Sequence, residues 1–461
     1  MNLPNDYIEE MKSLLGEEEY LLYKKALDEK SHLAIRINTS KISADDFIKI
    51  SPFKLTKVPF TDNGFYIEDT DAASKHPYYF AGLYYIQEPS AMVPASSADI
   101  KSSDKVLDLC AAPGGKATAV AAKNPALLIA NDISFSRTIP LVKNLELFGA
   151  KNSCVICEDP QRLSHIYPGF FDKILIDAPC SGEGMFRKDS RLISEWTKKR
   201  PQEYAPLQKS ILQSAVDMLS GGGDIIYSTC TFSKCEDEEV ISCILKENPN
   251  LSIQSLKHYD GFMPGFSDEY DFSGAIRLFP HHIKGEGHFV CKLHKDEEGR
   301  SKEAATASSN IKTFSKDQLD EKIVEFLKYV RLKDDNIRYY INDGFVYLIT
   351  PAVLKSLKKE LHYARTGVMI GHLKGKNNFV PATGFALYLK NGEFANVLNL
   401  RAFDERIIKY LKGETIEAKE AEDKVNKGFV LICVDDFPLG FAKFDGFKYK
   451  NLYTPGWRLN C

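Results

Sequence analysis

The sequence of 461 residues has no long apolar run and no compact set of cysteines. Its apolar stretches fall well short of the roughly 20 residues of a membrane-spanning helix, and no signal-peptide apolar region stands near the N-terminus. The ten cysteines follow neither zinc-ligand spacing nor a disulfide pattern, and we interpret the C-x-x-C pair Cys154 and Cys157 as structural. We therefore expect a monomeric protein of the reducing cytoplasm, with no membrane partner and no metal.

An excess of basic residues is also missing, because the formal net charge is −3 and the pI is about 6.4. A nucleic-acid-binding domain usually carries a basic surface, so any contact with nucleic acid would have to come from local clusters of Lys and Arg. The glycine-rich segment Ala111–Lys116 matches neither the G-x-G-x-x-G pattern of dinucleotide sites nor the lysine followed by Ser or Thr of a P-loop. These absences argue against dehydrogenases and P-loop nucleotidases.

What the sequence does contain is a series of short apolar runs that each end in a polar residue or a cysteine. Helical patterns lie between them, over residues 116–123, 135–148 and 204–219. Strands that alternate with helices predict an α/β fold with a parallel, doubly wound, Rossmann-like sheet. The five predicted strands are Lys105–Cys110, Leu127–Ala130, Cys154–Cys157, Lys173–Asp177 and Asp224–Thr229.

Carboxylates and a glycine-rich turn follow these strands, and the carboxyl ends of parallel strands form the ligand crevice of an open α/β sheet. The turn brings free N–H groups of a helix start to an anionic group, and Asp132 stands where Rossmann-like sites bind ribose hydroxyls. A ribose-bearing ligand is implied, and S-adenosylmethionine fits a loop that is not a dinucleotide loop. Asp159 and Asp177 end two further strands, so acidic side chains gather along this edge of the sheet.

Two cysteines occupy matching places at the ends of two other strands. Cys180 ends the run from Lys173, and Cys230 ends the run from Asp224. A lone cysteine is usually a small buried hydrophobe, but two thiols brought to one sheet edge from different strands suggest covalent chemistry.

The chain is long enough for several domains, and its composition divides it into segments. Asp6–Lys30 predicts a helix with Leu14, Leu15, Leu21, Leu22 and Ala26 on one face, and a polar stretch after residue 294 predicts a linker. The expected division is an N-terminal α+β domain (1–100), the α/β core (101–294), a linker (295–312), a middle domain (313–390) and a terminal β-rich module (391–461).

Three motifs of the predicted sheet edge resemble those of a known enzyme family. LDLCAAPGGKAT (Leu107–Thr118), DAPCSGEG (Asp177–Gly184) and YSTCTFSKCEDEE (Tyr227–Glu239) resemble, in wording and order, the Nop/Sun family of RNA (cytosine-5) methyltransferases. Gly285–Phe289 and the closing Asn451–Pro455 are similar, more weakly, to the bacterial F-type 16S ribosomal RNA methyltransferases. One departure is the acidic run Glu236–Glu239, where the family often has an Asn.

The resemblance implies a methyltransferase core over 101–294, an RNA-binding-like domain over 1–100 and a PUA-like module over 391–461. It implies that Cys230 is the nucleophile and that Cys180 assists release of the product, while Asp177 can hold or supply the proton at ring nitrogen 3 of cytosine. The methyl donor is S-adenosylmethionine, and the residues implied to bind it are Cys110, Ala111, Ala112, Pro113, Gly114, Gly115, Lys116, Asp132, Arg137, Asp159 and Asp177. The implied partner is RNA, with 16S ribosomal RNA or the small ribosomal subunit as the expected substrate. Two alternatives stay open: an enzyme acting on transfer RNA, and an RNA-binding ribosome assembly factor without turnover.

Two clusters of basic and aromatic residues are candidates for RNA contact. The first cluster follows the Cys180 motif, and its residues could instead form a solvated helix face. The second lies near the C-terminus, and its residues could instead form the core and rim of a small barrel. The first cluster is Phe186, Arg187, Lys188, Arg191, Trp196, Lys198, Lys199 and Arg200, and the second is Phe441, Lys443, Phe444, Phe447, Lys448, Tyr449, Lys450, Tyr453, Trp457 and Arg458.

Overall fold

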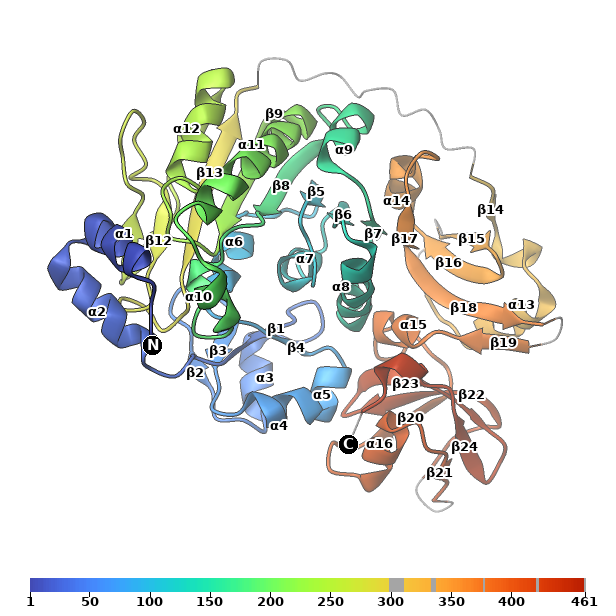
Figure 1. Ribbon diagram of the computed structural model, residues 1–461. Helices are drawn as coiled ribbons and strands as arrows, with labels where there is room; N and C mark the ends of the chain where they lie inside the picture. The colour runs from blue at the N-terminus through green and yellow to red at the C-terminus, as the bar shows by residue number, and fades with distance from the viewer. Residues whose placement is uncertain (298–310, 333–336, 376–377, 420–422, 460–461) are drawn as a thin grey trace.

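The computed structural model describes residues 1–297, 311–332, 337–375, 378–419 and 423–459 (Figure 1). Four sheets organise these residues, and the largest has ten strands. Most of the predicted linker at 295–312 lies outside the described residues, and the predicted domain boundaries stay predictions.

The central sheet contains all five predicted strands, side by side and parallel in the order β9-β8-β5-β6-β7. Strands of this kind are apolar along their whole length because helices cover both faces, and four of the five strands are almost completely buried. The prediction of a Rossmann-like fold is confirmed. The strands are β5 (Lys105–Asp108), β6 (Leu127–Asn131), β7 (Ser153–Ile156), β8 (Phe171–Asp177) and β9 (Leu219–Thr229).

A helix follows each of the parallel strands, and three of these helices correspond to the predicted patterns. They are α7 (Gly115–Ala121), α8 (Phe135–Leu147), α9 (Pro160–Ile166), α11 (Arg200–Met218) and α12 (Glu238–Glu247). Antiparallel strands extend the sheet past β9, namely β10 (Leu251–Gln254), β11 (Phe262–Pro264), β12 (Ile276–Leu278) and β13 (His288–Lys295). The carboxyl ends of the five parallel strands therefore meet along one edge, and the loops that follow them carry the predicted site.

The N-terminal segment differs from its prediction in one respect. The predicted helix over Asp6–Lys30 is two helices, α1 (Asn5–Leu15) and α2 (Glu17–Leu27), because Gly16 adopts φ 82° and turns the chain back. The predicted apolar face is wrong in part, since Leu21 and Leu22 are 57% and 52% exposed, whereas Ala26 is buried and Leu14 and Leu15 are partly buried. Tyr7, Met11, Tyr20, Tyr23 and Leu27 are buried instead, packed against Phe186, Trp196 and Phe232 of the core.

The rest of the N-terminal segment forms a four-stranded antiparallel sheet with short helices around it. Its elements are β1 (Ala34–Ile37), α3 (Ala44–Ile50), β2 (Thr56–Lys57), β3 (Gly64–Tyr66), α4 (Thr70–Lys75), α5 (Pro77–Phe80), β4 (Tyr84–Ile86) and α6 (Val93–Ser96). The sheet order is β2-β3-β1-β4, and it lies beside the core (Figure 1).

The segment after residue 310 forms a five-stranded sheet and also joins the core. Its strand β17 (Tyr363–Thr366) pairs with β7 and so lengthens the central sheet. The other elements are β14 (Thr313–Phe314), α13 (Glu321–Leu327), β15 (Arg338–Asn342), β16 (Phe345–Ile349), α14 (Pro351–Ser356), β18 (Val368–Lys374), β19 (Asn378–Pro381) and α15 (Thr383–Tyr388).

The last segment is a small β-rich module, drawn in red in Figure 1. Its strands are β20 (Val397–Leu400), β21 (Ile416–Glu417), β22 (Gly428–Val434), β23 (Phe437–Phe444) and β24 (Lys448–Asn451), with α16 (Glu405–Leu411). One buried apolar cluster contains both Ile35, Phe47 and Tyr84 of the N-terminal sheet and Ile432, Leu439 and Tyr449 of this module. The two ends of the chain therefore share a core. Among the described helices, none combines the length and apolar composition needed to cross a membrane.

Candidate active site

The glycine-rich turn follows β5 and forms the centre of the sheet edge. Gly114 has φ 115°, a conformation that favours glycine, and lets the chain turn into α7 at Gly115. The Arg137 guanidinium donates to the Ala112 carbonyl over 2.8 Å, and the Asn144 amide donates to the Pro113 carbonyl over 2.8 Å. Two side chains of α8 thus hold the predicted loop Cys110–Lys116 from behind and leave the N-terminus of α7 facing the edge.

Asp132 lies at the end of β6, beside this turn, and is only 2% exposed. Its carboxylate accepts hydrogen bonds from the Ala112 and Ser134 N–H groups over 3.3 and 3.0 Å, and Arg137 lies 3.5 Å away. The next residue, Ile133, is 66% exposed, so an apolar surface stands next to the acid. Asp159, after β7, is exposed, and its Oδ1 caps α9 by accepting from the Gln161 and Arg162 N–H groups.

Asp108, which the sequence analysis did not single out, is buried at the end of β5 directly before the turn. Neither of its carboxylate oxygens has a hydrogen-bond partner among the described residues, and burial raises its pKa to about 7. An unpartnered buried carboxylate is costly unless a cationic group compensates it. The edge therefore offers what an amino-acid ligand with a ribose requires: N–H donors, a ribose acceptor at Asp132 and a counter-charge at Asp108.

The two predicted cysteines meet across the loops after β8 and β9, where Cys180 Sγ lies 3.3 Å from Cys230 Sγ. The contact with Cys230, together with burial, raises the pKa of the Cys180 thiol well above its ordinary value. At neutral pH Cys180 therefore keeps its proton and can donate it toward the sulfur of Cys230.

Buried hydrogen bonds join these two loops to each other. The Glu236 carboxylate accepts from the Ser181 N–H and from the Gln208 amide, each over 2.9 Å. The Gly184 N–H donates to the Cys230 carbonyl over 2.8 Å, and the Ser181 and Thr231 hydroxyls are 2.8 Å apart. Glu236 belongs to the acidic run in which the chain departs from the Nop/Sun pattern, and burial raises its pKa. The first three acids of the run are buried, and Glu236 links the two loops that carry the thiols.

Asp177, at the end of β8, lies between the cysteines and the glycine-rich turn. Lys116 forms an ion pair with it over 2.7 Å, and the Ser228 hydroxyl donates to it over 3.2 Å. Burial by itself would raise the pKa of Asp177, but Lys116 and His288 outweigh that effect and hold the pKa well below its ordinary value. Asp177 is consequently an ionised hydrogen-bond acceptor.

His288 is a second residue that the sequence analysis did not single out. It is buried at the start of β13, its Nδ1 lies 2.9 Å from the Gly287 carbonyl, and its Nε2 lies 3.5 Å from Asp177 Oδ1. Its only signal in the sequence was its place in the motif Gly285–Phe289. The antiparallel pairing of β13 with β9, which the sequence analysis did not predict, brings the histidine to Asp177.

The predicted RNA contacts after the Cys180 motif are partly wrong. Phe186 and Trp196 are buried against α1 and α2, and the Trp196 indole donates to Glu183 over 2.9 Å. The Arg187 guanidinium is buried as well and pairs with Glu286 over 2.7 Å. These three side chains are buried beneath the N-terminal helices, where the two aromatic rings form part of an apolar cluster, and they cannot contact RNA in this arrangement. Lys188, Arg191, Lys198 and Lys199 are exposed and stay candidates.

Comparison with known families divides the chain into three matches. Residues 96–294 match the family described as 16S rRNA methyltransferase RsmB/F. Residues 3–89 match the N-terminal domain of 16S rRNA methyltransferase RsmF, and residues 397–459 match the methyltransferase RsmF PUA domain. The first match contains the glycine-rich turn, Asp132, Asp159, Asp177 and both cysteines.

Individual relatives cover nearly the whole chain. A ribosomal RNA small subunit methyltransferase F of Escherichia coli is 32% identical over 91% of this chain and 89% of its own. That of Vibrio parahaemolyticus is 30% identical over 97% of this chain and 96% of its own. Among solved structures, a methyltransferase homolog protein from Pyrococcus horikoshii is similar, with a TM-score of 0.54 and 29% identity over 61% of this chain and 91% of that chain.

Proposed function

Because the chain belongs to the family of 16S rRNA methyltransferases RsmB/F, we propose that it methylates carbon 5 of cytosine in 16S ribosomal RNA by covalent catalysis through Cys230. The observation that carries the proposal is the 3.3 Å approach of Cys180 and Cys230 beside an ionised Asp177. A protein that only binds RNA has no need of two thiols in contact.

S-adenosylmethionine is the proposed cofactor, and when bound it supplies an electrophilic methyl group. The residues proposed to hold it are the turn Cys110–Lys116 for its carboxylate, Asp132 with Arg137 for its ribose, and Asp159 at the end of β7. Asp108 has no hydrogen-bond partner among the described residues, which supports placing the positively charged amino group of the cofactor beside it. No metal enters the proposal.

Cys230 is the proposed nucleophile. Carbon 5 of cytosine is a poor nucleophile until a thiolate adds to carbon 6, which converts the ring to an enamine. After methyl transfer a water molecule or another base takes the proton from carbon 5, the electron pair of that C–H bond re-forms the carbon 5–carbon 6 double bond, and the carbon 6–sulfur bond breaks to expel the Cys230 thiolate. Cys180 keeps its proton in the free enzyme. It can therefore donate that proton toward the departing sulfur of Cys230.

Asp177 is proposed to stabilise the proton that ring nitrogen 3 takes up when the thiolate adds. An ionised carboxylate does this by accepting a hydrogen bond from the protonated nitrogen, so the low pKa of Asp177 supports a role as acceptor. Lys116 and His288 are positioning residues in this proposal, because they act on the base only through the Asp177 carboxylate.

The names of the relatives favour ribosomal RNA over transfer RNA as the substrate. The PUA match and the exposed lysines of β23 and β24 support an RNA-binding role for the terminal module. A monomer in the cytoplasm stays part of the proposal.

The decisive experiment compares Cys230→Ala with Cys180→Ala, using in vitro transcribed 16S ribosomal RNA and S-adenosylmethionine. Cys230→Ala should transfer no methyl groups and form no covalent adduct. Cys180→Ala should add and transfer but release slowly, so a protein–RNA adduct should accumulate and survive denaturing electrophoresis. The adduct should require both RNA and S-adenosylmethionine.

Cys243→Ala is the matched control, since Cys243 is an exposed cysteine of α12 away from the sheet edge. It should behave as the wild type. An adduct trapped in Cys230→Ala and absent in Cys180→Ala would reverse the two roles. Full activity in both variants would rule out covalent catalysis, and bisulfite mapping of the product locates the methylated cytosine.

A further inference from the structure

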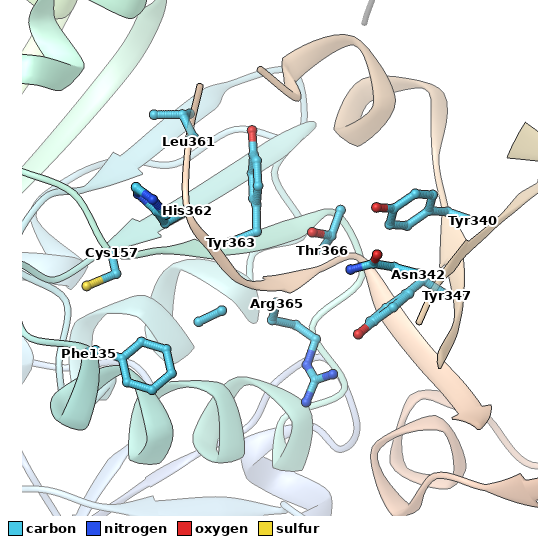
Figure 2. A pocket seen from close by; sticks show the side chains of 11 residues that line it. Phe135, Cys157, Tyr340, Asn342, Tyr347, Leu361, His362, Tyr363, Arg365 and Thr366 are labelled. Carbon is cyan, nitrogen blue, oxygen red and sulfur yellow. The ribbon is translucent and has the colours of Figure 1, made fainter. Parts of the chain in front are cut away.

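A cleft of about 660 Å³ opens where the five-stranded sheet that follows residue 310, here called the middle sheet, meets the methyltransferase core (Figure 2). Its core wall contains Phe135, the first residue of α8, and Cys157, which follows β7. Its other wall comes from β15, β16 and β17. None of the three family matches includes the residues of this second wall, because the matches end at residue 294 and resume at 397.

The cleft lies on the same sheet edge as the cofactor residues. The Cys157 N–H donates to the His362 carbonyl over 3.1 Å, and the Cys157 thiol contacts the Ile133 carbonyl at 3.5 Å, next to Asp132. The His362 ring lies 2.8 Å from Glu158, which directly precedes Asp159. Cys180 follows β8, four strand positions from β17, and at the usual spacing this is about 20 Å. A strand of RNA can span that distance with a few nucleotides.

The side chains that line the cleft are those that recognise nucleobases. The Tyr340 and Tyr347 rings are 5.9 Å apart, and Phe135 on the opposite wall is 65% exposed, an unusual state for phenylalanine. Asn342, two residues after Tyr340 on the same strand, is exposed and also lines the cleft, so its amide can pair with a base edge. Arg365 lies 5.9 Å from the Tyr347 ring and is anchored to Glu146 over 3.0 Å.

We propose that this cleft binds an unpaired nucleotide of the substrate RNA that lies a few nucleotides away from the target cytosine. The base stacks on Tyr340 and Tyr347, and Asn342 forms hydrogen bonds with the edge of the base. The inference rests on the proposed function. The rival occupant with the same chemistry is the adenine of the cofactor. RNA is favoured because the cofactor residues all lie within 96–294, so the cofactor site is complete without the middle sheet.

The test uses Tyr340→Ala/Tyr347→Ala and Asn342→Ala in the full chain, with Phe345→Ala as the control. Phe345 is an exposed ring of the same hairpin that does not line the cleft. Filter binding with 16S ribosomal RNA at fixed salt should show at least ~10-fold weaker affinity for the double variant, since stacking dominates sequence-tolerant binding of single strands. Calorimetry with S-adenosylmethionine should show unchanged affinity.

RNA affinity equal to that of the control would overturn the proposal, and so would a loss of S-adenosylmethionine affinity, which would assign the cleft to adenine. A second readout is photo-cross-linking of 5-bromouridine-substituted RNA to the wild type, mapped by mass spectrometry to Tyr340 or Tyr347. Cross-links that map only to other segments would also overturn it. Failure of the wild type to methylate RNA would defeat the proposed function, whereas the binding and cross-linking readouts report on the cleft alone.

Discussion

At the scale of single residues, the chemistry of the site depends on neighbouring charges that shift one another's pKa values. Lys116 and His288 both face Asp177 and keep it ionised, while the neighbouring carboxylate of Asp108 is buried without a hydrogen-bond partner among the described residues. Two acids that lie beside the same turn thus have pKa values shifted in opposite directions. Environment, rather than residue type, decides their roles.

His288→Phe tests this arrangement, because it keeps the ring volume and removes the nitrogen that faces Asp177. We expect kcat to fall about 10-fold, because the Asp177 carboxylate loses a close neighbour that helps to hold its pKa low. The KM for S-adenosylmethionine should stay unchanged, as measured by tritium transfer to RNA. His288→Gln restores an N–H donor and should recover most of kcat; equal losses in both variants would mean that His288 only fills space.

At the scale of elements, the loop that carries Cys230 is held between β9 and α12 by a buried arginine. Arg277 of β12 pairs with Glu238 and Asp237 at the start of α12, and its Nη1 donates to the Phe232 carbonyl over 2.9 Å. Burial raises the pKa of Asp237 well above its ordinary value, although Arg277 opposes the shift. The arginine is therefore the charge that lets this acidic run stay inside the protein.

Arg277→Met should destabilise the protein by about 3–5 kcal/mol, because it leaves two buried carboxylates without their counter-charge. An acid whose pKa is raised in the folded state stabilises below its unfolded pKa and loses that contribution as the pH rises. The deficit of the variant should therefore grow between pH 5 and pH 8 in urea unfolding. Arg191→Met, at an exposed pair with Asp189, should stay within about 0.5 kcal/mol of the wild type. A pH-independent deficit would contradict the account.

At the scale of the whole molecule, the ends of the chain are packed together. The N-terminal sheet and the terminal module share one apolar cluster, and the Tyr78 hydroxyl donates to Asp435 over 3.0 Å. Removing residues from 391 onward would expose this shared core as well as part of a second cluster that contains Phe326 and Phe441. The RNA-binding role of the module is better tested on its surface than by truncation.

Lys443 and Lys450 are the surface pair for this test. They stand directly opposite each other on β23 and β24 and both are exposed. Like charges in that position cost stability, which supports a function in binding phosphate. Lys443→Ala/Lys450→Ala should weaken binding to 16S ribosomal RNA and lower the salt slope by about 1 per lost phosphate contact. Filter binding over a salt series measures both, with Lys246→Ala on α12 as the control; an unchanged slope would remove this face from the RNA interface.

The tail cluster shows why residue types alone left its alternatives open. Phe441, Phe444, Tyr449 and Tyr453 are core residues of the module, whereas Phe447 is 71% exposed. Alternation along a strand separates the two sets, but sequence reasoning needs the strand register to apply it. The same limit explains Leu21 and Leu22, whose helical face could not be assigned until the turn at Gly16 was known.

The sequence by itself determined the parallel sheet, because apolar runs and turns are local signals that require no knowledge of contacts. It also determined that Cys180, Cys230, Asp132 and Asp177 lie on one edge, since parallel strands bring their carboxyl ends together. Only the tertiary structure decided that Asp108 has no hydrogen-bond partner among the described residues, that His288 faces Asp177 and that Glu236 joins the two cysteine loops. These depend on antiparallel pairing and burial between segments far apart in the chain, and no local pattern encodes such contacts.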